Sequence, residues 1–498
     1  MGSLLVRRPD VIYYLVAGYY VLSLVLKLLR PASLEFDDSE QAFLSQYLML
    51  GYGRQPPFYN WLQYAVVGVF GISVASLTVV KNSLLFGCLL FYGLSARLIT
   101  GDRVLSAIAI LGALTLPPIF LLAQRDLTHT VAALFAASLF LFGFFYALKH
   151  PSQIGGFLIV GVAAGLGTIS KYNFVVLPLA AILALLFEPK FRKRLFDWRV
   201  LVSLAAFVTI IAPHGYWVLN NLTQASGGTI AEMKQGAENS VLPHVVLGLY
   251  SFAIAGMKGV AVPSAVFAFV FRADLRKILC AKSQWTRIVG RMIIACFFIV
   301  AIIVVAIGAT HIREKWLALF TVLFPFYLIL KVDASGVDPV PRLPALLSIV
   351  GVLVIGVILI LWASVYIGPR IKDYSLAHTP YGGFARTIRE GHGGDPAAIV
   401  AEDRVMAGNL RIQFPNTPVI LAGFPPNSDV LPVRQGPVLV AWSAEGEKKE
   451  NIPPRVSRIL SHAGVDLTGL QATIISLPYN AGRVGDVYPF AYVWVDLR

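Results

Sequence analysis

The sequence has little charge, and this scarcity excludes most soluble folds. Only 14% of its 498 residues are Asp, Glu, Lys or Arg, whereas 57% are hydrophobic. Such a composition in a chain of this length is typical of a polytopic membrane protein. Cysteine is scarce as well. Cys88, Cys280 and Cys296 fall in or beside apolar segments or in a basic loop, so a disulfide framework is excluded.

The signatures of several enzyme and transporter classes are also missing. Gly382-Gly383 and Gly393-Gly394 are doublets without the Lys-Ser/Thr of a phosphate-binding loop. We find no metal-ligand pair at i, i+4 spacing, no Cys/His cluster and no Gly-x-Ser-x-Gly elbow. The net charge of +14 does not indicate nucleic-acid binding, because the largest basic cluster lies in short loops where membrane topology explains it.

Long apolar segments are what the sequence has in abundance. A span needs roughly 20 mainly apolar residues to cross the ~30 Å hydrocarbon core, and helix is the default because lipid offers no partners to backbone groups. We therefore expect an α-helical polytopic membrane protein with about eleven transmembrane helices. The first is too long for a signal-peptide core and lacks a cleavage pattern, so we expect it to be retained. The predicted spans are 11–29, 77–98, 104–121, 128–148, 154–170, 173–187, 199–219, 244–270, 291–310, 316–331 and 343–367.

Lys and Arg predict the orientation, because short cytoplasmic loops hold their excess. With Arg7 and Arg8 inside, the inside loops also receive Arg97, Arg103, Lys149, the basic cluster 190–194 and the basic residues of 272–287. The sequence thus predicts a multi-pass protein of the bacterial inner membrane with a cytoplasmic N-terminus. The opposite, periplasmic face receives the first loop, 31–76, and everything after about residue 370.

Two amphipathic helices are predicted inside that first outer loop. Apolar residues between Asp38 and Leu50 follow an approximate helical stripe, and Phe58–Val74 is a second apolar stretch. Pro56-Pro57 would break the chain between them, and both would lie on the membrane surface. The alternative, that 57–75 is another span, would move the 190–194 cluster outside, so charge bias favours the surface helix.

Acids gather on the predicted outer face. Phe36-Asp37-Asp38-Ser39-Glu40 puts three carboxylates between two long apolar segments, and the next outer turn adds Asp126. An acid that slips into the bilayer costs about 2.5–3.5 kcal/mol, so one at its edge usually has a task or a partner. Arg125 could be the partner of Asp126.

Cations and aromatic residues share this face. Lys171 could be a snorkelling anchor or a ligand, and His214 could belong to an interfacial aromatic belt or contact substrate. His311, Arg313 and Lys315 flank Glu314, where the cations could hold a lipid-linked phosphate or pair with that acid. The 220–243 loop, rich in Gly, Gln, Asn and Ser, has the composition of a mobile cover over a site.

From about residue 370 the composition shifts, which predicts a periplasmic α/β domain over 370–498 after a transmembrane catalytic domain over 1–369. Apolar runs shorten to strand length, and the domain has no cysteine, as suits a periplasm. We expect helices at 403–414 and 456–462. The expected strands are 397–401, 419–422, 438–442, 472–477 and 491–495.

These motifs together resemble a known family. The Asp37-Asp38 pair, the Gln55-Pro56-Pro57-Phe58-Tyr59-Asn60-Trp61 run, Asp126 and Ser170-Lys171 resemble the GT-C membrane glycosyltransferases of the protein-mannosyltransferase-like group, which includes the lipid A aminoarabinose transferases. Arg-Asp-Leu-Thr-His-Thr from Arg125 and Ser-Lys-Tyr-Asn from Ser170 look most like bacterial lipopolysaccharide galacturonosyltransferases. The motif match covers roughly 10–220, and the rest matches by layout.

The resemblance implies inverting transfer of a sugar from a polyprenyl-phosphate carrier to a lipid or glycan acceptor, lipopolysaccharide or lipid A. It implies that Asp37 is the general base and that Asp38 and Asp126 are further catalytic acids. Aminoarabinose transferases have Lys where this chain has Gln55, and Arg54 could take its place. The residues that the resemblance and the outer-face pattern assign to substrate binding are Glu40, Arg54, Gln55, Tyr59, Arg125, Lys171, His214, His311, Arg313 and Lys315.

Two questions stay open from the sequence. The carboxylates of Asp37, Asp38, Glu40 and Asp126 could ligate a divalent cation through oxygen, although nothing in the sequence requires one. A secondary transporter or lipid flippase is the alternative function. Transporters tend to have internal repeats, which this sequence lacks, and an outer terminal domain favours an enzyme.

Overall fold

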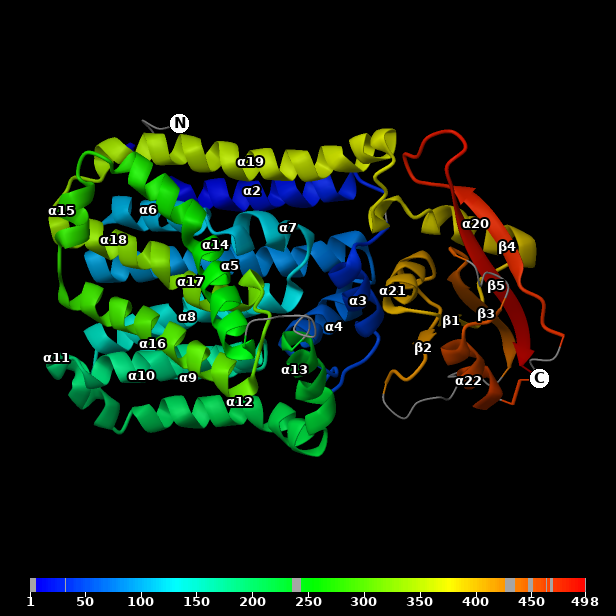
Figure 1. Ribbon diagram of the computed structural model, residues 1–498, viewed down its shortest axis with the longest axis horizontal. Helices are drawn as coiled ribbons and strands as arrows, with labels where there is room; N and C mark the ends of the chain where they lie inside the picture. The colour runs from blue at the N-terminus through cyan, green and yellow to red at the C-terminus, as the bar shows by residue number, and fades with distance from the viewer. Residues whose placement is uncertain are drawn as a thin grey trace. The chain divides into compact units, whose positions relative to one another are not determined.

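The computed structural model describes residues 6–31, 33–234, 243–425, 435–446, 451–462, 464–465 and 469–497. It is a helical chain with one five-stranded sheet in its C-terminal part (Figure 1). The chain forms two compact units. Unit 1 comprises Met1–Val21, Met49–Tyr59 and Lys81–Val357, and unit 2 comprises Leu22–Leu48, Asn60–Val80 and Ile358–Arg498.

Within the described ranges, eight helical segments are long and apolar enough to cross a membrane. Two further pairs of helices, bent by 67° and 114°, would bring the number to ten. The eight are α2 (Val11–Leu28), α5 (Val74–Thr100), α8 (Thr128–Lys149), α12 (Val200–Asn220), α14 (His244–Val270), α16 (Gln284–Ile307), α17 (Glu314–Thr321) with α18 (Leu323–Ser335), and α19 (Leu343–Ile367) with η5 (Val340–Arg342) and η6 (Gly368–Ile371). The bent pairs are α6 (Arg103–Ala113) with η1 (Pro118–Leu122) and α7 (Ala123–Arg125), and η2 (Tyr172–Val175) and α10 (Val176–Leu186) with α11 (Pro189–Arg192) and η3 (Lys193–Phe196).

All eleven predicted spans contain helix, and the protein is a multi-pass membrane protein. The prediction of eleven counts α9 (Ile154–Thr168), which at 15 residues is shorter than a full span. The bends have a local cause, because Pro117-Pro118 and Pro189 interrupt helical hydrogen bonding at the two breaks. The remaining short helices of unit 1 are η4 (Thr223–Gly227), α13 (Gly228–Met233) and α15 (Leu275–Cys280). In the predicted 220–243 cover, residues 235–242 lie outside the described residues.

Helix α9 packs closely between α8 and α12 because glycine removes side chains at the contacts. A Cβ on Gly161 would lie 2.2 Å from the carbonyl oxygen of Ser203, and one on Gly156 would lie 2.6 Å from the backbone nitrogen of Ala147. Small residues let helices in lipid approach backbone to backbone. This packing fixes Ser170-Lys171, which follow α9 directly.

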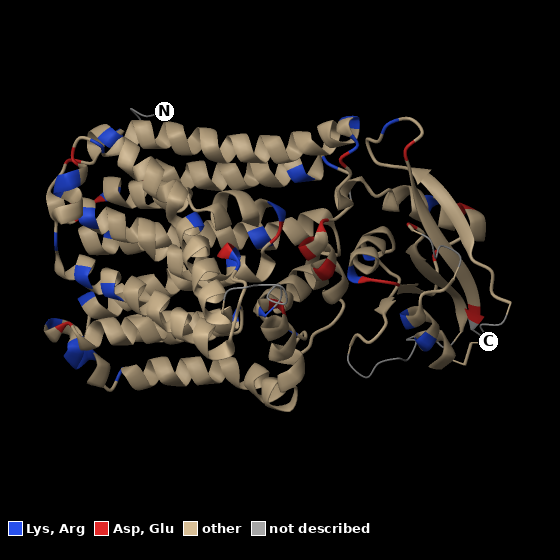
Figure 2. Cartoon of the chain, in the orientation of Figure 1, with Lys and Arg blue, Asp and Glu red and all other residues tan. Residues whose placement is uncertain are grey.

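Basic residues of unit 1 gather at one end of its helices, as Figure 2 shows around α11 and α15. Arg97 and Arg103 both pair with Asp10, at 3.1 and 3.3 Å, and Arg287 pairs with Glu188 at 2.8 Å. Ion pairs therefore connect the N-terminal segment to the loop at 97–103, and the loop at 188–194 to the loop at 272–287. Charge bias assigns all four segments to the inside.

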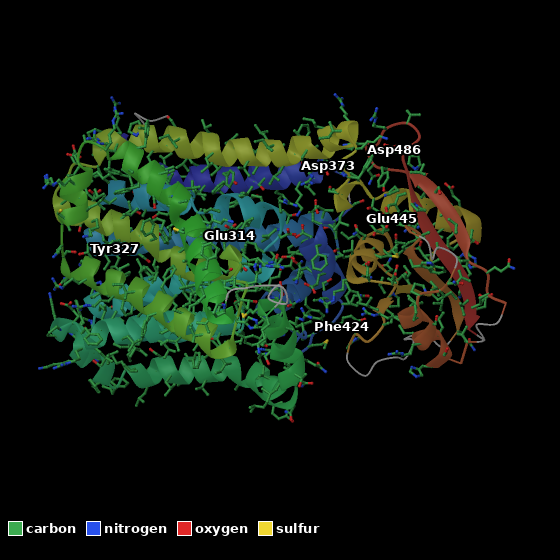
Figure 3. The ribbon with its side chains drawn as sticks, in the orientation of Figure 1. Glu314, Tyr327, Asp373, Phe424, Glu445 and Asp486 are labelled. Atoms are coloured by element: carbon green, nitrogen blue, oxygen red, sulfur yellow. The ribbon has the colours of Figure 1, made fainter. Side chains whose placement is uncertain are left out.

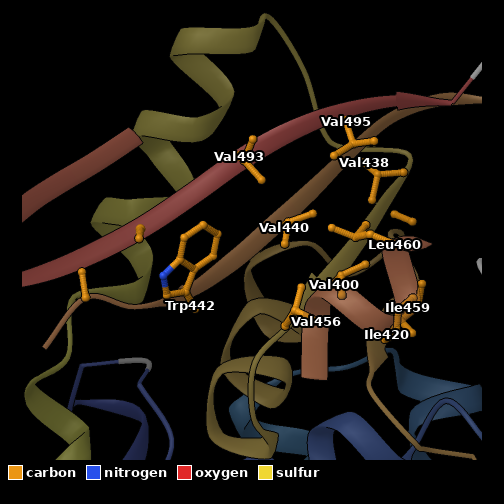
Figure 4. Close-up of a cluster of buried hydrophobic side chains, with 13 residues drawn as sticks. Val400, Ile420, Val438, Val440, Trp442, Val456, Ile459, Leu460, Val493 and Val495 are labelled. Carbon is orange, nitrogen blue, oxygen red and sulfur yellow. The ribbon is translucent and has the colours of Figure 1, made fainter. Parts of the chain in front are cut away.

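The C-terminal sheet lies in unit 2 and has the strand order β2-β1-β3-β5-β4. Strands β1 (Ala398–Ala401), β2 (Val419–Leu421) and β3 (Gly436–Ser443) are parallel, and β5 (Val487–Leu497) and β4 (Thr473–Pro478) add two antiparallel strands. Helix α21 (Arg404–Gln413) connects β1 to β2, and α22 (Pro454–His462) packs its apolar face on the core around Trp442 (Figure 4). Helix α20 (Tyr381–His392) and η7 (Leu376–His378) precede β1.

The five strands and two helices predicted for this α/β part are confirmed, each within a few residues. The buried runs at β1, β2 and β3 are completely or largely apolar, as strands covered on both faces require. Helix α20 was not predicted, because the doublet Gly382-Gly383 hides its amphipathic pattern in the sequence.

The first predicted outer loop contains two helices, as expected. They are α3 (Phe36–Leu44) and α4 (Phe58–Phe70), separated by a segment that holds Pro56-Pro57. With 13 residues, α4 is about 20 Å long and too short to cross a ~30 Å hydrocarbon core. The alternative of a further span at 57–75 is therefore wrong.

Candidate active site

Helix α3 of unit 2 presents three carboxylates within its first two turns. Asp37 is half-buried, whereas Asp38 and Glu40 are only 2% and 6% exposed. Asp37 and Asp38 occupy the first turn, where the unpaired N–H groups of a helix favour negative charge. The local sequence therefore stabilises both a helix start and an anionic site at this position.

Two of these acids have cationic partners on other helices. Lys27, in the last turn of α2, pairs with Asp38, and Arg404, at the start of α21, pairs with Glu40. Burial raises the pKa of Glu40, the Arg404 guanidinium opposes that rise, and the Asp37 charge adds to it. Compensation by cations is what allows such acids to be buried.

Helix α3 is also held by α4. The Asn60 side chain donates to Oε1 of Gln41 at 3.1 Å, and both residues are buried. The Gln63 side chain donates to the backbone oxygen of Ser76 at 3.2 Å, which ties α4 to the start of α5. The Asn60 of the sequence motif thus has a supporting role for the acid-bearing helix.

In unit 1, Asp126 lies at the break between α7 and α8. It is half-buried, its neighbour Arg125 is exposed, and the next residue, Leu127, is buried with a left-handed backbone (φ 72°, ψ 33°). A left-handed conformation is costly for a branched side chain, and such strain persists where the surroundings enforce it, often at functional sites. The chain therefore changes direction at Asp126.

Lys171 connects this region to the fifth predicted outer turn. Its ammonium group donates to Oγ1 of Thr130 at 3.0 Å and to the carbonyl of Lys315 at 3.1 Å. Two residues on, the Asn173 side chain donates to the carbonyl of Trp316 at 2.8 Å. The structure therefore brings together three segments that the sequence singled out separately, 126–130, 171–173 and 313–316.

The turn before α17 carries the predicted cations. Arg313 pairs with Glu232 at 2.9 Å, and the N–H groups of Thr310 and His311 donate to the carbonyl of Met233 at 2.8 and 3.1 Å. His311 is exposed and Lys315 is half-buried. Glu314, labelled in Figure 3, begins α17 between them. Of the two alternatives for these cations, a phosphate or Glu314 as partner, the structure instead pairs Arg313 with Glu232 of α13.

Arg54 and Gln55 lie in the segment before α4. Arg54 is exposed, and a Cβ on Gly228 would lie 1.9 Å from its Nε, so glycine at the start of α13 makes room for the guanidinium. Gln55 is half-buried and forms an isolated β-bridge with Tyr52. Helix α13 thus contacts Arg54 near its first residue and Arg313 near its last turn.

His214 and Tyr59 are packed into the helices. The His214 ring is buried, lies 2.7 Å from the Leu50 carbonyl through Nδ1 and 3.1 Å from the Tyr172 hydroxyl through Nε2, and stacks on Trp217. Both ring nitrogens therefore have partners within the protein. Tyr59 is 1% exposed, and its ring centroid lies 5.9 Å from that of His129.

An apolar cavity of about 460 Å³ lies between α14, α16, α17 and α18. Its walls include Phe252, Met257, Phe297 and Phe320. The cavity adjoins the cationic turn, because Oγ of Ser251, next to Phe252, accepts a hydrogen bond from the Ile312 N–H at 2.8 Å.

The sequence left open whether these acids ligate a divalent cation. Asp38 and Glu40 already have Lys27 and Arg404 as partners. Among the described residues, no group of three or more His, Cys, Asp or Glu is arranged to hold a metal ion.

Sequence reasoning missed four residues of these networks. Lys27 and Arg404 look like a span-end cation and a surface cation in the sequence, and only the folded chain brings them to Asp38 and Glu40. Thr130 and His129 stand in the Arg125–Thr130 motif, so their signal was present, but no pattern assigned them a role.

Comparison with known proteins gives one family match and two full-length relatives. The family described as dolichyl-phosphate-mannose-protein mannosyltransferase matches residues 54–217. Lipopolysaccharide core galacturonosyltransferase RgtA of Rhizobium johnstonii is 41% identical over 487 residues, which cover 97% of this chain and 96% of the relative. RgtB of the same organism is 40% identical over 492 residues, covering 98% and 99%.

Solved structures agree on the fold. ArnT from Cupriavidus metallidurans bound to undecaprenyl phosphate superimposes with a TM-score of 0.62 at 12% identity, covering 97% of each chain, and its apo state does so with a TM-score of 0.53. The transporter or flippase alternative is set aside, because the full-length relatives are glycosyltransferases. The chain belongs to the GT-C family of membrane glycosyltransferases, in the group of the lipopolysaccharide core galacturonosyltransferases.

Proposed function

We propose that this glycosyltransferase moves a galacturonosyl residue from a polyprenyl-phosphate carrier to the lipopolysaccharide core or lipid A. The observation that carries the proposal is the acid-bearing helix α3, in a chain about 40% identical throughout to two core galacturonosyltransferases. The carrier follows from the solved relative of the same fold, which holds undecaprenyl phosphate.

Asp37 acts as the general base in this proposal. Its carboxylate takes the proton of the acceptor hydroxyl while the oxygen attacks the anomeric carbon, and the bond from that carbon to the phosphate oxygen breaks with inversion. A positioned base contributes typically about 10²- to 10⁴-fold. Asp38 and Glu40 are buried whereas Asp37 is half-buried, so Asp37 is the acid of α3 that an acceptor hydroxyl could reach most easily. Asp126 is proposed as the second catalytic acid.

The cations of unit 1 suit the leaving phosphate. Lys171, Lys315, Arg313 and Arg54 lie in or against the connected segments described above, and cations stabilise the charge that develops on a departing phosphate. The apolar cavity that adjoins this cationic turn would take part of the isoprenoid chain.

We infer that the basic end of unit 1 is cytoplasmic in a bacterial inner membrane, with residues 1–369 as the membrane catalytic domain and 370–498 as a periplasmic domain. Connection of the basic loops at one end supports this orientation. An alkaline phosphatase reporter fused after the last residue should be active, and a green fluorescent protein fused there should be dark.

Transfer by the purified protein in liposomes tests the function. Synthetic undecaprenyl-phosphate galacturonic acid and lipopolysaccharide lacking core galacturonate are the substrates, and mass spectrometry reads the product. We expect one added galacturonate of inverted anomeric configuration. If galactose or aminoarabinose is transferred instead, the proposed sugar is wrong. If no carrier-linked sugar is transferred while a solute crosses the membrane, the proposed reaction is wrong.

A further inference from the structure

Helix α21 of the C-terminal part packs directly on the acid-bearing helix α3, and both belong to unit 2. We propose that Arg404 is a positioning residue for sugar transfer, which holds Glu40 and thereby the turn of α3 that presents Asp37. The inference rests on the proposed function in assigning the base to α3. It gives the C-terminal α/β part a role in the reaction itself.

The ion pair between Arg404 and Glu40 is asymmetric in burial. The Glu40 side chain is 8% exposed, whereas the Arg404 side chain is 39% exposed and can be changed without opening a cavity. Removing one partner of a buried pair leaves an uncompensated charge, which is far costlier than the pair was worth. Loss of the Arg404 cation would therefore leave the buried Glu40 side chain without its charged partner.

Arg404 itself is fixed by its surroundings. Asp403, directly before it, caps α21 by accepting the Met406 N–H at 2.8 Å. The Arg404 guanidinium lies 5.9 Å from the ring centroid of Phe424, which contacts the rings of Phe43 and Tyr47 on the α3 side (Phe424 is labelled in Figure 3). The Arg404 guanidinium thus reaches Glu40 from the capped first turn of α21 and lies against the Phe424 ring.

The backbones of the two helices touch. A Cβ on Gly408 would lie 1.9 Å from the carbonyl oxygen of Ser39, so only glycine permits this approach. Asn409 accepts the Leu34 N–H at 2.7 Å through Oδ1, and Gln46 accepts the Val419 N–H at 2.9 Å. Helix α21 and strand β2 therefore hold the segment 34–46 by hydrogen bonds at both ends and by the backbone contact at Ser39 in its middle.

Glu40 and Asp37 are electrostatically coupled. They stand three residues apart on α3 and so share one face, and the charge of Asp37 already raises the pKa of Glu40. A change in the position or charge of Glu40 is therefore felt at Asp37.

The test compares Arg404→Met, Arg404→Lys and the control Arg455→Met in the full-length protein. Arg455 is an exposed cation on α22 of the same sheet domain, so its replacement makes the same chemical change elsewhere. We expect Arg404→Met to lower kcat about 10- to 10²-fold with little change in KM, as misplaced groups do. Arg404→Lys should recover most of kcat, and Arg455→Met should behave as wild type.

Asp37→Asn separates this inference from the proposed function. If Asp37→Asn is inactive while Arg404→Met keeps wild-type kcat, the positioning role is overturned and the proposed base stands. Loss of activity in Arg404→Met that Lys does not restore also overturns it, since general destabilisation would explain that loss. If Asp37→Asn is fully active, the proposed function itself fails.

Discussion

Replacing Gly408 by alanine tests the packing of α21 on α3 with one methyl group. The new Cβ would lie 1.9 Å from the Ser39 oxygen and 2.4 Å from its carbonyl carbon, about 1.5 Å short of ordinary van der Waals contact. Both obstructing atoms belong to backbone, so no side-chain rotation relieves the clash and the two helices must separate. Overpacking of this kind costs about 1 to 3 kcal/mol.

The fall in the transfer rate should be larger than the loss of stability alone would cause. A shift of about 1 Å in a catalytic group can cost about 10²-fold in rate, and the required separation is of that size. We therefore expect Gly408→Ala to lower kcat for galacturonosyl transfer by roughly that factor and to lower the thermal midpoint of the purified protein.

Gly391→Ala is the matched control. Gly391 lies in α20 of the same sheet domain, and nothing lies within 4 Å of a Cβ built there. Its replacement should leave transfer unchanged and stabilise the helix by up to about 1 kcal/mol. If Gly408→Ala transfers sugar and unfolds like the wild type, the described contact does not position α3.

Three further predictions concern other parts of the site. Burial raises the folded-state pKa of Glu40, so its contribution to stability is present below the ordinary pKa and is lost as pH rises through the raised value. The thermal midpoint of the protein should therefore fall as pH rises over that window. Glu40→Gln, which cannot titrate, should make this fall smaller. Thr130→Val removes an acceptor from the ammonium of Lys171 and should lower kcat/KM roughly tenfold or more, because hydrogen bonds to charged groups are worth about 1.5 to 3 kcal/mol; unchanged kcat/KM would show that Thr130 does not hold this cation. Gly256→Leu fills the apolar cavity and should raise the KM for the carrier-linked sugar about tenfold, whereas Gly351→Leu, with open space at its Cβ, should not.

The sequence predicted those parts of the fold that depend on local pattern. Apolar runs of span length gave α2, α5 and α8, and strand-length runs gave β1 to β5, because burial in lipid or in a sheet core demands uninterrupted hydrophobicity. Helix α20 was not predicted because two glycines lie in its first turn.

The partners of the site residues could not be predicted in the same way. Arg404 and Glu40 are 364 residues apart, and no periodicity connects them. Lys171 was identified by its motif, but its acceptors on Thr130 and Lys315 depend on how α8 and α17 pack. The sequence left open whether His214 belongs to an interfacial aromatic belt or contacts substrate, and it could not predict the ring's contacts with Leu50 and Tyr172.

The rate of transfer by Asp37→Asn, measured with undecaprenyl-phosphate galacturonic acid in liposomes, tests the central claim most directly. The amide keeps the shape of the side chain and removes its basicity, and the exposed Asp395→Asn serves as control for the same change in the sheet domain. The account predicts a fall of about 10²- to 10⁴-fold in kcat with unimpaired carrier binding. A wild-type rate in Asp37→Asn would contradict it.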